Sequence, residues 1–448
     1  MVIWAEKTCV RDECSYQKMA DALLQGQGIQ DISGWLWAPA YPTLLAGMEL
    51  LTGYKGGIQP LQLLATILTQ ILLIGLGKQL YNDRAARGLS WFYALNPTFI
   101  FYTSSYWSET IYTLLLVAAV WMLGRSRGDL RFSWWGVEKA PLAGAWMAGL
   151  LVGACVLFRG VATYILPIFL IGLWWGRPFA AVRQQLLVCC VAAVLVVAPY
   201  SFYATQKFGE LVISDRTLGQ MMWLGNNTFD PVSFDWGHGV LKEEEYKALD
   251  LIGRRHCDIK NPAVKDRCET EGGLRWIQEH PAEFLQRVPL RVAQMLTPHS
   301  FLTRHLRWGR WEGLPTPVRE GLILSVPFFT FLTLIGGTIG FFGALGRPTQ
   351  GHSDSRSART SWYPLVAGLI VLYHVAAIAV LAGVSRYRVP LEPLWLVFLG
   401  GLWADPRGTV EQISSSNLRY GLWLLTVGTL LLLMLRFLPA GWSWWLSW

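Results

Sequence analysis

The chain has 448 residues, of which 53% are hydrophobic and 15% are charged. Soluble domains carry roughly 25% charged residues, so this composition excludes an ordinary soluble protein. The net charge of +8 comes from scattered lysines and arginines rather than from a basic tract, so it does not indicate a nucleic-acid partner. The 24 tryptophans suit a protein with long membrane interfaces. We therefore expect an all-α polytopic protein of the lipid bilayer.

The chain opens on a polar, partly charged stretch that contains an acidic pair, Asp12-Glu13. Five apolar residues then recur at helical spacing and predict an amphipathic helix that lies flat on the membrane: Tyr16, Met19, Ala20, Leu23 and Leu24. Gly26 and Gly28 are expected to end this helix. Because Met1 opens directly into a polar stretch, we hypothesise that a first spanning helix precedes it.

Ten apolar segments approach or reach the roughly 20 residues that cross a bilayer. Their length and continuity predict helices rather than barrel strands. Asn96-Pro97 interrupts the second of them. The predicted spans are residues 58–80, 89–104, 107–124, 141–158, 159–176, 184–204, 320–344, 362–382, 385–403 and 420–437.

The charges of the short loops predict the orientation, because cytoplasmic loops are enriched in Lys and Arg. The basic loops, expected in the cytoplasm, are 78–88, 125–140, 177–183, 345–361 and 404–419. The alternate set is then outside: 1–57, 104–108, 159–160, 205–319 and 383–388. We expect a first outer loop (1–57), N-terminal spans (58–204), a small mixed outer domain (205–319) and C-terminal spans (320–448).

The seven cysteines divide by place. Cys155, Cys189 and Cys190 lie inside predicted spans, where they act as small apolar residues. The pairs Cys9 and Cys14, and Cys257 and Cys268, lie in predicted outer loops. An oxidising compartment allows a disulfide in each pair, and the sequence leaves both disulfides and free thiols open.

Three carboxylates are candidates for chemistry. Asp12 can accept a proton from an attacking hydroxyl, with Glu13 beside it; the alternative is a solvated acidic pair. Glu109 begins a span at its outer end, where an ionisable group suggests function. The alternative for Glu109 is a residue favoured by the helix dipole, with Ser108 as cap.

Three arginines are candidates for binding a phosphate. Arg386 and Arg388 lie at the outer end of a span before Pro390, and guanidiniums bind phosphate in a bidentate way. The alternative is snorkelling to lipid headgroups, which explains one arginine more easily than two. Arg159 lies between two spans on the same predicted side.

Asn226 is a candidate for contacts to sugar hydroxyls, with an ordinary turn as the alternative. The sequence contains no phosphate-binding P-loop, no dinucleotide fingerprint, no paired-cysteine zinc motif and no Asp-x-Asp. We therefore expect no cofactor, and the lack of an acidic cluster argues against a divalent metal. A lipid-linked donor fits better than a soluble nucleotide sugar.

Four stretches together resemble the membrane-integral GT-C glycosyltransferases. RDECSYQKMADALLQGQG with WAPAYPTLL is similar to their first outer loop, and ALNPTFIFYTSSYWSETIY to their third and fourth spans. LGNNTFDP is similar to the entry of their outer domain, and SRYRVPLEPLWL to their late "RY-x-x-P" segment. The subgroups resembled are the dolichyl-phosphate-mannose protein mannosyltransferase-like and the aminoarabinose transferase-like bacterial enzymes.

The resemblance implies a polyprenyl-phosphate sugar donor, an acceptor on the outer face and inversion at the anomeric carbon. It implies that Asp12 is the base, with Glu13 and Glu109 as further acidic site residues. Arg386 and Arg388 are expected on the donor phosphate. Tyr16 and Tyr387 belong to the matching stretches and are expected to contact substrate.

The sequence departs from the family pattern in lacking a recognisable first span. The 205–319 loop shows no clear match to the protein mannosyltransferases, so a lipid, a glycan and a protein all stay open as acceptors.

We therefore expect a hexosyl- or pentosyltransferase of the plasma (inner) membrane with its active site on the outer (periplasmic) side. One alternative is a transporter or flippase for lipid-linked sugars, which predicts midplane charges and related repeats. Neither is visible in the sequence. The other alternative is an inactive structural membrane subunit.

Overall fold

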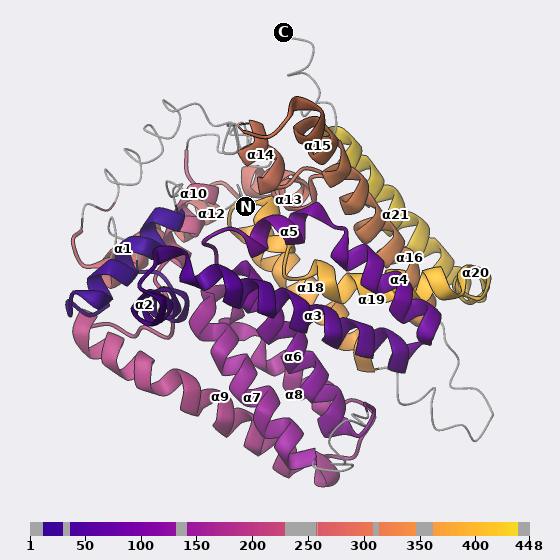
Figure 1. Ribbon diagram of the computed structural model, residues 1–448, viewed down its shortest axis with the longest axis horizontal. Coiled ribbons are helices and arrows are strands. Elements are labelled where there is room, and N and C mark those ends of the chain that lie inside the picture. The colour runs from indigo at the N-terminus through magenta and orange to yellow at the C-terminus, as the bar shows by residue number, and fades with distance from the viewer. Residues whose placement is uncertain are drawn as a thin grey trace.

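The computed structural model describes residues 12–29, 36–130, 141–228, 257, 259–307, 313–345 and 362–437. Within these ranges the ordered elements are helices and no strand occurs; an isolated bridge pairs Leu36 with Arg216. Figure 1 shows α6 to α9 as one group of helices, with α15, α16 and α21 along another side. The expected all-α polytopic fold is confirmed.

Within the described ranges, six helices are long and apolar enough to cross a membrane. Two shorter apolar helices occur at Gly160–Trp174 (η4, Gly160–Tyr164, and α8, Leu166–Trp174) and Glu392–Ala404 (α19). The predicted count of ten therefore stays a prediction. The six are Lys55–Leu80 (η2, Lys55–Gly57, and α3, Ile58–Leu80), α7 (Pro141–Phe158), α9 (Phe179–Phe208), α18 (Trp362–Val380), α21 (Asn417–Phe437) and Thr316–Leu345, which joins α15 (Thr316–Phe331) to α16 (Gly337–Leu345) through a π-helical turn.

The span predicted over 89–104 is interrupted at Asn96-Pro97, as predicted. It is divided between α4 (Asp83–Ala94) and α5 (Pro97–Thr103). Asn96 caps α5 by accepting the backbone N–H of Thr98 at 3.0 Å, and Pro97 has no N–H to extend the preceding helix. The following predicted span corresponds to the helix α6 (Glu109–Arg127), which is not among the six.

The predicted N-terminal helix is present as α1 (Asp12–Leu24). Its apolar face packs on protein rather than on lipid, because α2 (Ala40–Thr52) and the chain before it cover that face. The Tyr16 ring lies 5.1 Å from that of Tyr41 in an edge contact. Leu24 is 41% exposed and does not share this face, which corrects the expectation for that residue.

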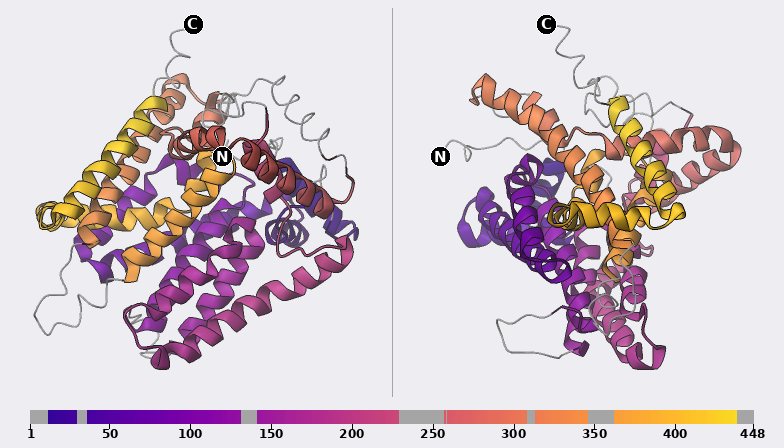
Figure 2. Two further views of the ribbon diagram at one scale, coloured as in Figure 1. Left: turned by 180° about the vertical axis from the view of Figure 1, so that it is seen from behind. Right: turned by 90° about the vertical axis from the view of Figure 1, so that its right-hand side faces the viewer.

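Glycines set the distance between α7 and α9. A Cβ at Gly149 would lie 2.2 Å from the Cys189 carbonyl oxygen, and one at Gly153 would lie 2.7 Å from that of Ala193. The two glycines are four residues apart, so they share one face of α7 and allow close backbone approach. Figure 2 shows α9 as the long helix beside this group.

In the described part of the 205–319 segment, the helices between α9 and α15 are α10 (Leu218–Gly225), α12 (Pro262–Glu279), α13 (Pro281–Leu296) and α14 (Phe301–Arg307). Of the two alternatives that the sequence left open for Cys257 and Cys268, the structure has the disulfide, which links the chain before α12 to that helix. Cys14 is also disulfide-bonded, and Cys9 lies outside the described residues. Whether residues 205–319 form a domain of their own stays a prediction.

Candidate active site

A cavity of about 1220 Å³ lies where several distant segments meet. Its walls come from the N-terminal segment, the turn between α7 and α8, residues 211–224, α12, α14, the end of α18 and the chain before α19. Ligand pockets typically measure roughly 300–1,000 Å³, so this cavity has room for more than one small group. The loops that the charge pattern assigns to one face therefore converge on one cavity.

A chain of ion pairs joins four residues from four elements. Arg386 Nη1 lies 2.5 Å from Asp12 Oδ2, and Arg386 Nε lies 2.8 Å from Glu109 Oε1. Arg159 Nη1 lies 2.5 Å from the same Glu109 oxygen. Asp12, Arg159 and Arg386 line the cavity, while Glu109 lies behind the two arginines with 1% of its surface exposed. The chain therefore runs Asp12–Arg386–Glu109–Arg159.

Local structure places each member of this chain. Asp12 and Glu109 are the first residues of α1 and α6, where a helix dipole favours negative charge. Arg386 belongs to the 3-10 turn η6 (Ser385–Arg388), and Arg159 precedes η4. Ser108 occupies the N-cap position of α6 but makes no side-chain capping bond, so the capping role given to it in the alternative for Glu109 is wrong. The Glu109 carboxylate instead forms ion pairs with Arg159 and Arg386.

Burial strengthens the Coulomb attraction within these ion pairs relative to surface pairs. The side chains of Arg159 and Arg386 are 9% and 8% exposed, whereas Asp12 is 36% exposed. The Arg386 guanidinium lies 4.8 Å from the centroid of the Trp107 ring. An aromatic face and two carboxylates thus hold a buried cation whose planar donors match a phosphate. Asp12 is the exposed end of the chain.

The two predicted tyrosines also line the cavity. Burial raises the pKa of Tyr16 to about 12, although Arg386 and Arg159 oppose that rise. Its phenol is therefore neutral at physiological pH and available as a hydrogen-bond donor. The Tyr387 ring lies 5.6 Å from the Arg159 guanidinium and packs beside the ion-pair chain.

Three predicted site residues are not part of the cavity lining. Glu13 is fully buried and accepts the backbone N–H of Tyr106 at 3.1 Å. Asn226 is also fully buried; it donates to the Val380 carbonyl at 2.8 Å and accepts from Arg291 at 2.9 Å. Neither contributes to the cavity lining. Both act in packing the segments that form the cavity.

Arg388 is the third of these residues. It is 1% exposed, lies 2.7 Å from Glu392 and donates to the backbone carbonyls of Met295 and Thr297. The lining of the cavity does not include it. The two arginines of Ser385–Arg388 thus have different partners, because only Arg386 faces Asp12 and Glu109.

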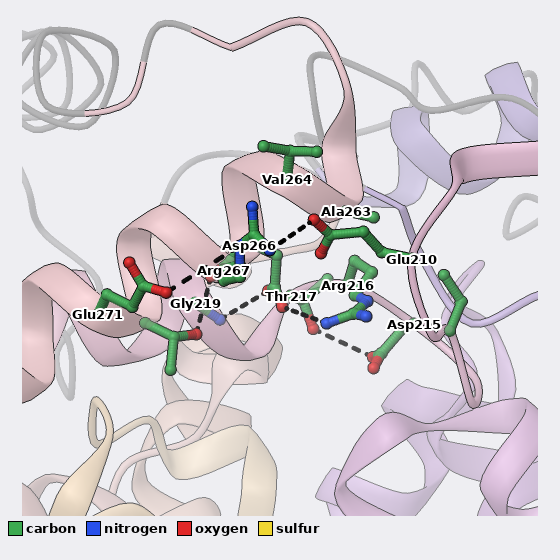
Figure 3. Close-up of polar contacts among 12 residues, drawn as sticks. Glu210, Asp215, Arg216, Thr217, Gly219, Ala263, Val264, Asp266, Arg267 and Glu271 are labelled. Carbon is green, nitrogen blue, oxygen red and sulfur yellow. Dashed lines mark hydrogen bonds and ion pairs between the residues drawn. The ribbon is translucent and has the colours of Figure 1, made fainter. Parts of the chain in front are cut away.

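Sequence reasoning missed a second polar wall, formed by residues 211–217 and α12. Figure 3 shows the contacts that hold it: Arg216 to Asp266 at 3.3 Å, and Asp266 to the Gly219 N–H at 2.7 Å. Thr217 donates to Asp215 at 3.0 Å. Isolated charges in a long loop carry no spacing signal, so only the fold brings this wall to the cavity.

Asp215 links this wall to the ion-pair chain. It accepts the backbone N–H of Gly160, the residue after Arg159. A Cβ at Gly160 would lie 1.9 Å from an Asp215 carboxylate oxygen, so the contact requires glycine. Burial raises the pKa of Asp215 to about 6. Among the described residues, no three His, Cys, Asp or Glu side chains gather as a metal site.

The fold and the site define a multi-pass helical membrane protein with a charged site at the ends of its spans. Residues 45–242, less than half of the chain, match the family model "Mannosyltransferase (PIG-V)". This match supports the resemblance to GT-C membrane glycosyltransferases. The comparison with curated proteins finds no match.

Two solved proteins are similar in fold. One is the oligosaccharyltransferase AglB from Archaeoglobus fulgidus, solved with an inhibitory peptide and a dolichol-phosphate; the TM-score is 0.48 at 14% identity, over 98% of this chain and 52% of that one. The other is ArnT from Cupriavidus metallidurans bound to undecaprenyl phosphate, with a TM-score of 0.39 at 12% identity. This match covers 91% of this chain and 75% of ArnT. The chain spans about half the length of the archaeal protein.

Proposed function

We propose that the chain is a membrane glycosyltransferase that transfers a mannosyl group from a polyprenyl phosphate to an acceptor hydroxyl. The observation that carries the proposal is the Asp12–Arg386–Glu109–Arg159 chain at the wall of a cavity. It combines an accessible carboxylate with two buried guanidiniums, which suit a proton acceptor and a phosphate clamp. The match to the mannosyltransferase family supports mannose as the sugar.

In the proposed reaction, the Asp12 carboxylate accepts the proton of the acceptor hydroxyl while the hydroxyl oxygen bonds to the anomeric carbon. The bond from that carbon to the phosphate oxygen breaks, and its electron pair leaves with the polyprenyl phosphate. A single displacement of this kind inverts the anomeric centre. The acceptor hydroxyl and the donor phosphate lie on opposite sides of the reacting carbon.

Arg386 and Arg159 hold the leaving phosphate in this proposal. The phosphate gains one negative charge as the bond breaks, and fixed guanidiniums stabilise that charge without reorganising. The donor phosphate competes with Asp12 for Arg386, so donor binding frees the carboxylate to act as base. Glu109 binds both guanidiniums and offsets their mutual repulsion.

The proposal places the reaction on the outer face of the plasma (inner) membrane. The alternation of basic loops supports this side, because the short cavity segments belong to the set of short loops with fewer cations; the long 205–319 loop is left out, since long loops report orientation poorly. Nucleotide sugars are absent outside that membrane, and the sequence has no Asp-x-Asp to bind one. A lipid-linked donor is consistent with both features.

The test is transfer by the purified protein in lipid vesicles, with labelled sugar supplied on different donors. We expect transfer from dolichyl- or undecaprenyl-phosphate mannose and none from GDP-mannose. Transfer of glucose but not mannose from polyprenyl phosphate would overturn the sugar assignment. Transfer from GDP-mannose alone would overturn the lipid donor, and movement of the intact lipid-linked sugar between leaflets would favour the transporter alternative.

A further inference from the structure

The cavity has a second polar end that the proposed transfer does not use. Lys265 and Glu269 lie one turn apart on α12 and line the same cavity as Asp12 and Arg386. Neither belongs to the ion-pair chain. This end is therefore a candidate for binding a second group while the first end holds the donor phosphate.

Glu269 is buried without the hydrogen bonds that a carboxylate needs. It is 1% exposed, and neither carboxylate oxygen has a hydrogen-bond partner within the described part of the chain. The Lys265 Nζ atom is 4.0 Å away, beyond hydrogen-bond distance. An unsatisfied buried acceptor of this kind destabilises a protein unless a ligand compensates.

The neighbouring Asp266 shows the contrast. Its carboxylate accepts the Gly219 N–H and pairs with Arg216, so it is engaged in holding α12 against the 211–217 stretch (Figure 3). Glu269 lies on the same helix and has no such structural contact. Burial also raises the pKa of Glu269 to about 7, although the Lys265 ammonium group opposes that rise.

We propose that Lys265 and Glu269 form the acceptor subsite and bind a neutral, polyhydroxylated sugar. This inference rests on the proposed transferase function and names the substrate class of its acceptor. A carboxylate next to an ammonium group offers one hydrogen-bond acceptor and one donor, which suits two adjacent sugar hydroxyls. Trp223, on the α10 helix that packs against α12, adds an aromatic surface to the cavity wall.

The charges of this end argue against other acceptors. Among the lining residues from 211–217 and α12, Asp215, Asp266 and Glu269 outnumber Arg216 and Lys265, which disfavours a phosphate group. The ammonium group of Lys265 disfavours a second amine beside the carboxylate. The cavity volume of about 1220 Å³ accommodates a donor sugar and an acceptor sugar together.

The test compares Glu269→Gln with Glu271→Gln in the full-length protein in lipid nanodiscs. Glu271 lies on the same helix, is 63% exposed and pairs only weakly with Arg267. Binding of methyl mannobioside, a neutral disaccharide, is measured by ligand-detected NMR, and binding of dolichyl phosphate is measured separately. The melting temperature of each variant is also measured, by thermal unfolding.

We expect Glu269→Gln to weaken methyl mannobioside binding about tenfold, as for the loss of a hydrogen bond to a charged group. Dolichyl phosphate binding should be unchanged, and the melting temperature unchanged or raised, because a buried carboxylate that makes no hydrogen bond is removed. Glu271→Gln should alter none of these quantities.

Unchanged sugar binding in Glu269→Gln, or no sugar binding by the wild type, would overturn the subsite. A lowered melting temperature with unchanged sugar binding would show a structural carboxylate and overturn it as well. Sugar binding that depends on Glu269, without transfer by the wild type, would support the subsite and overturn the transferase proposal. The two failures are therefore distinguishable.

Discussion

Arg386 connects the beginning of the chain to its end. Its guanidinium binds Asp12, 374 residues away, and Glu109, which begins α6. Trp107 covers its face. A group with so many fixed neighbours is preorganised, so a charge that develops beside it needs little rearrangement.

We expect Arg386→Lys to lower kcat for mannosyl transfer by roughly 100-fold, the usual effect of losing one preorganised donor. Lysine keeps the charge but cannot contact two carboxylates and a phosphate with a planar group. The measurement is a rate with saturating dolichyl-phosphate mannose. Arg319→Lys, at a residue 39% exposed on α15, serves as the control. A kcat within twofold of the wild type would exclude the phosphate clamp.

Asp215 should make the stability depend on pH. Its pKa of about 6 in the folded protein exceeds the ordinary 3.8, with burial as the main cause and Asp266 adding to it. The folded state therefore takes up a proton between about pH 6 and 4 that the unfolded state does not. The contribution of Asp215 to stability is least favourable above pH 6 and improves as the pH falls.

We expect Asp215→Asn to be more stable than the wild type at pH 7.5 and to lose roughly half of that advantage at pH 5. Asparagine retains an oxygen that accepts the Gly160 N–H. Thermal unfolding of both proteins at both pH values measures the difference in stability. Because Glu269 is the same in the two proteins, its own titration cancels from that difference. An advantage that stays constant or grows at low pH would contradict the pKa assignment.

Sequence reasoning selected the four residues of the ion-pair chain because charges at the ends of apolar spans stand out. It could not separate Arg386 from Arg388, because the direction of each side chain depends on the 3-10 turn η6 and on the backbone carbonyls before α14. It also could not find Glu269, since a carboxylate in a polar helix becomes buried only through tertiary packing. The roles of all these residues remain proposals.

At the level of elements, α7 and α9 depend on close backbone approach at Gly149 and Gly153. We expect Gly149→Val to lower the free energy of unfolding by about 1–3 kcal/mol, the range for overpacking. Gly421→Val on α21, where a Cβ would meet nothing within 4 Å, is the control. Denaturation in mixed detergent micelles measures both variants. Equal stability of the two would contradict the packing account.

The local sequence predicted some features of the other elements but not all of them. The break at Asn96-Pro97 was visible in the sequence, because a proline ends the preceding helix and an asparagine caps the next. The partner of α1 was not visible, because an amphipathic stripe packs equally well on lipid or on protein. Here the aromatic residues Trp37 and Tyr41 cover Tyr16.

For the whole molecule, the charge pattern predicts which loops share a side. We expect Lys18→Cys to react with a membrane-impermeant maleimide on intact cells. Arg84→Cys and Arg407→Cys, at exposed positions in basic loops, should react only after the membrane is permeabilised. The unmodified protein controls for its own free cysteines, Cys155, Cys189 and Cys190. The reverse pattern would place the cavity in the cytoplasm.

The central claim is that Asp12 accepts the acceptor proton at the exposed end of the ion-pair chain. The most direct measurement is the rate of mannosyl transfer from dolichyl-phosphate mannose by Asp12→Asn and by Asp21→Asn. Asp21 lies on the same helix and makes only a half-exposed pair with Lys55, at 2.8 Å.

The account predicts a loss of roughly 100- to 10,000-fold for Asp12→Asn, the range for general acid–base catalysis, with Asp21→Asn at the wild-type rate. Equal rates for the two variants would contradict it.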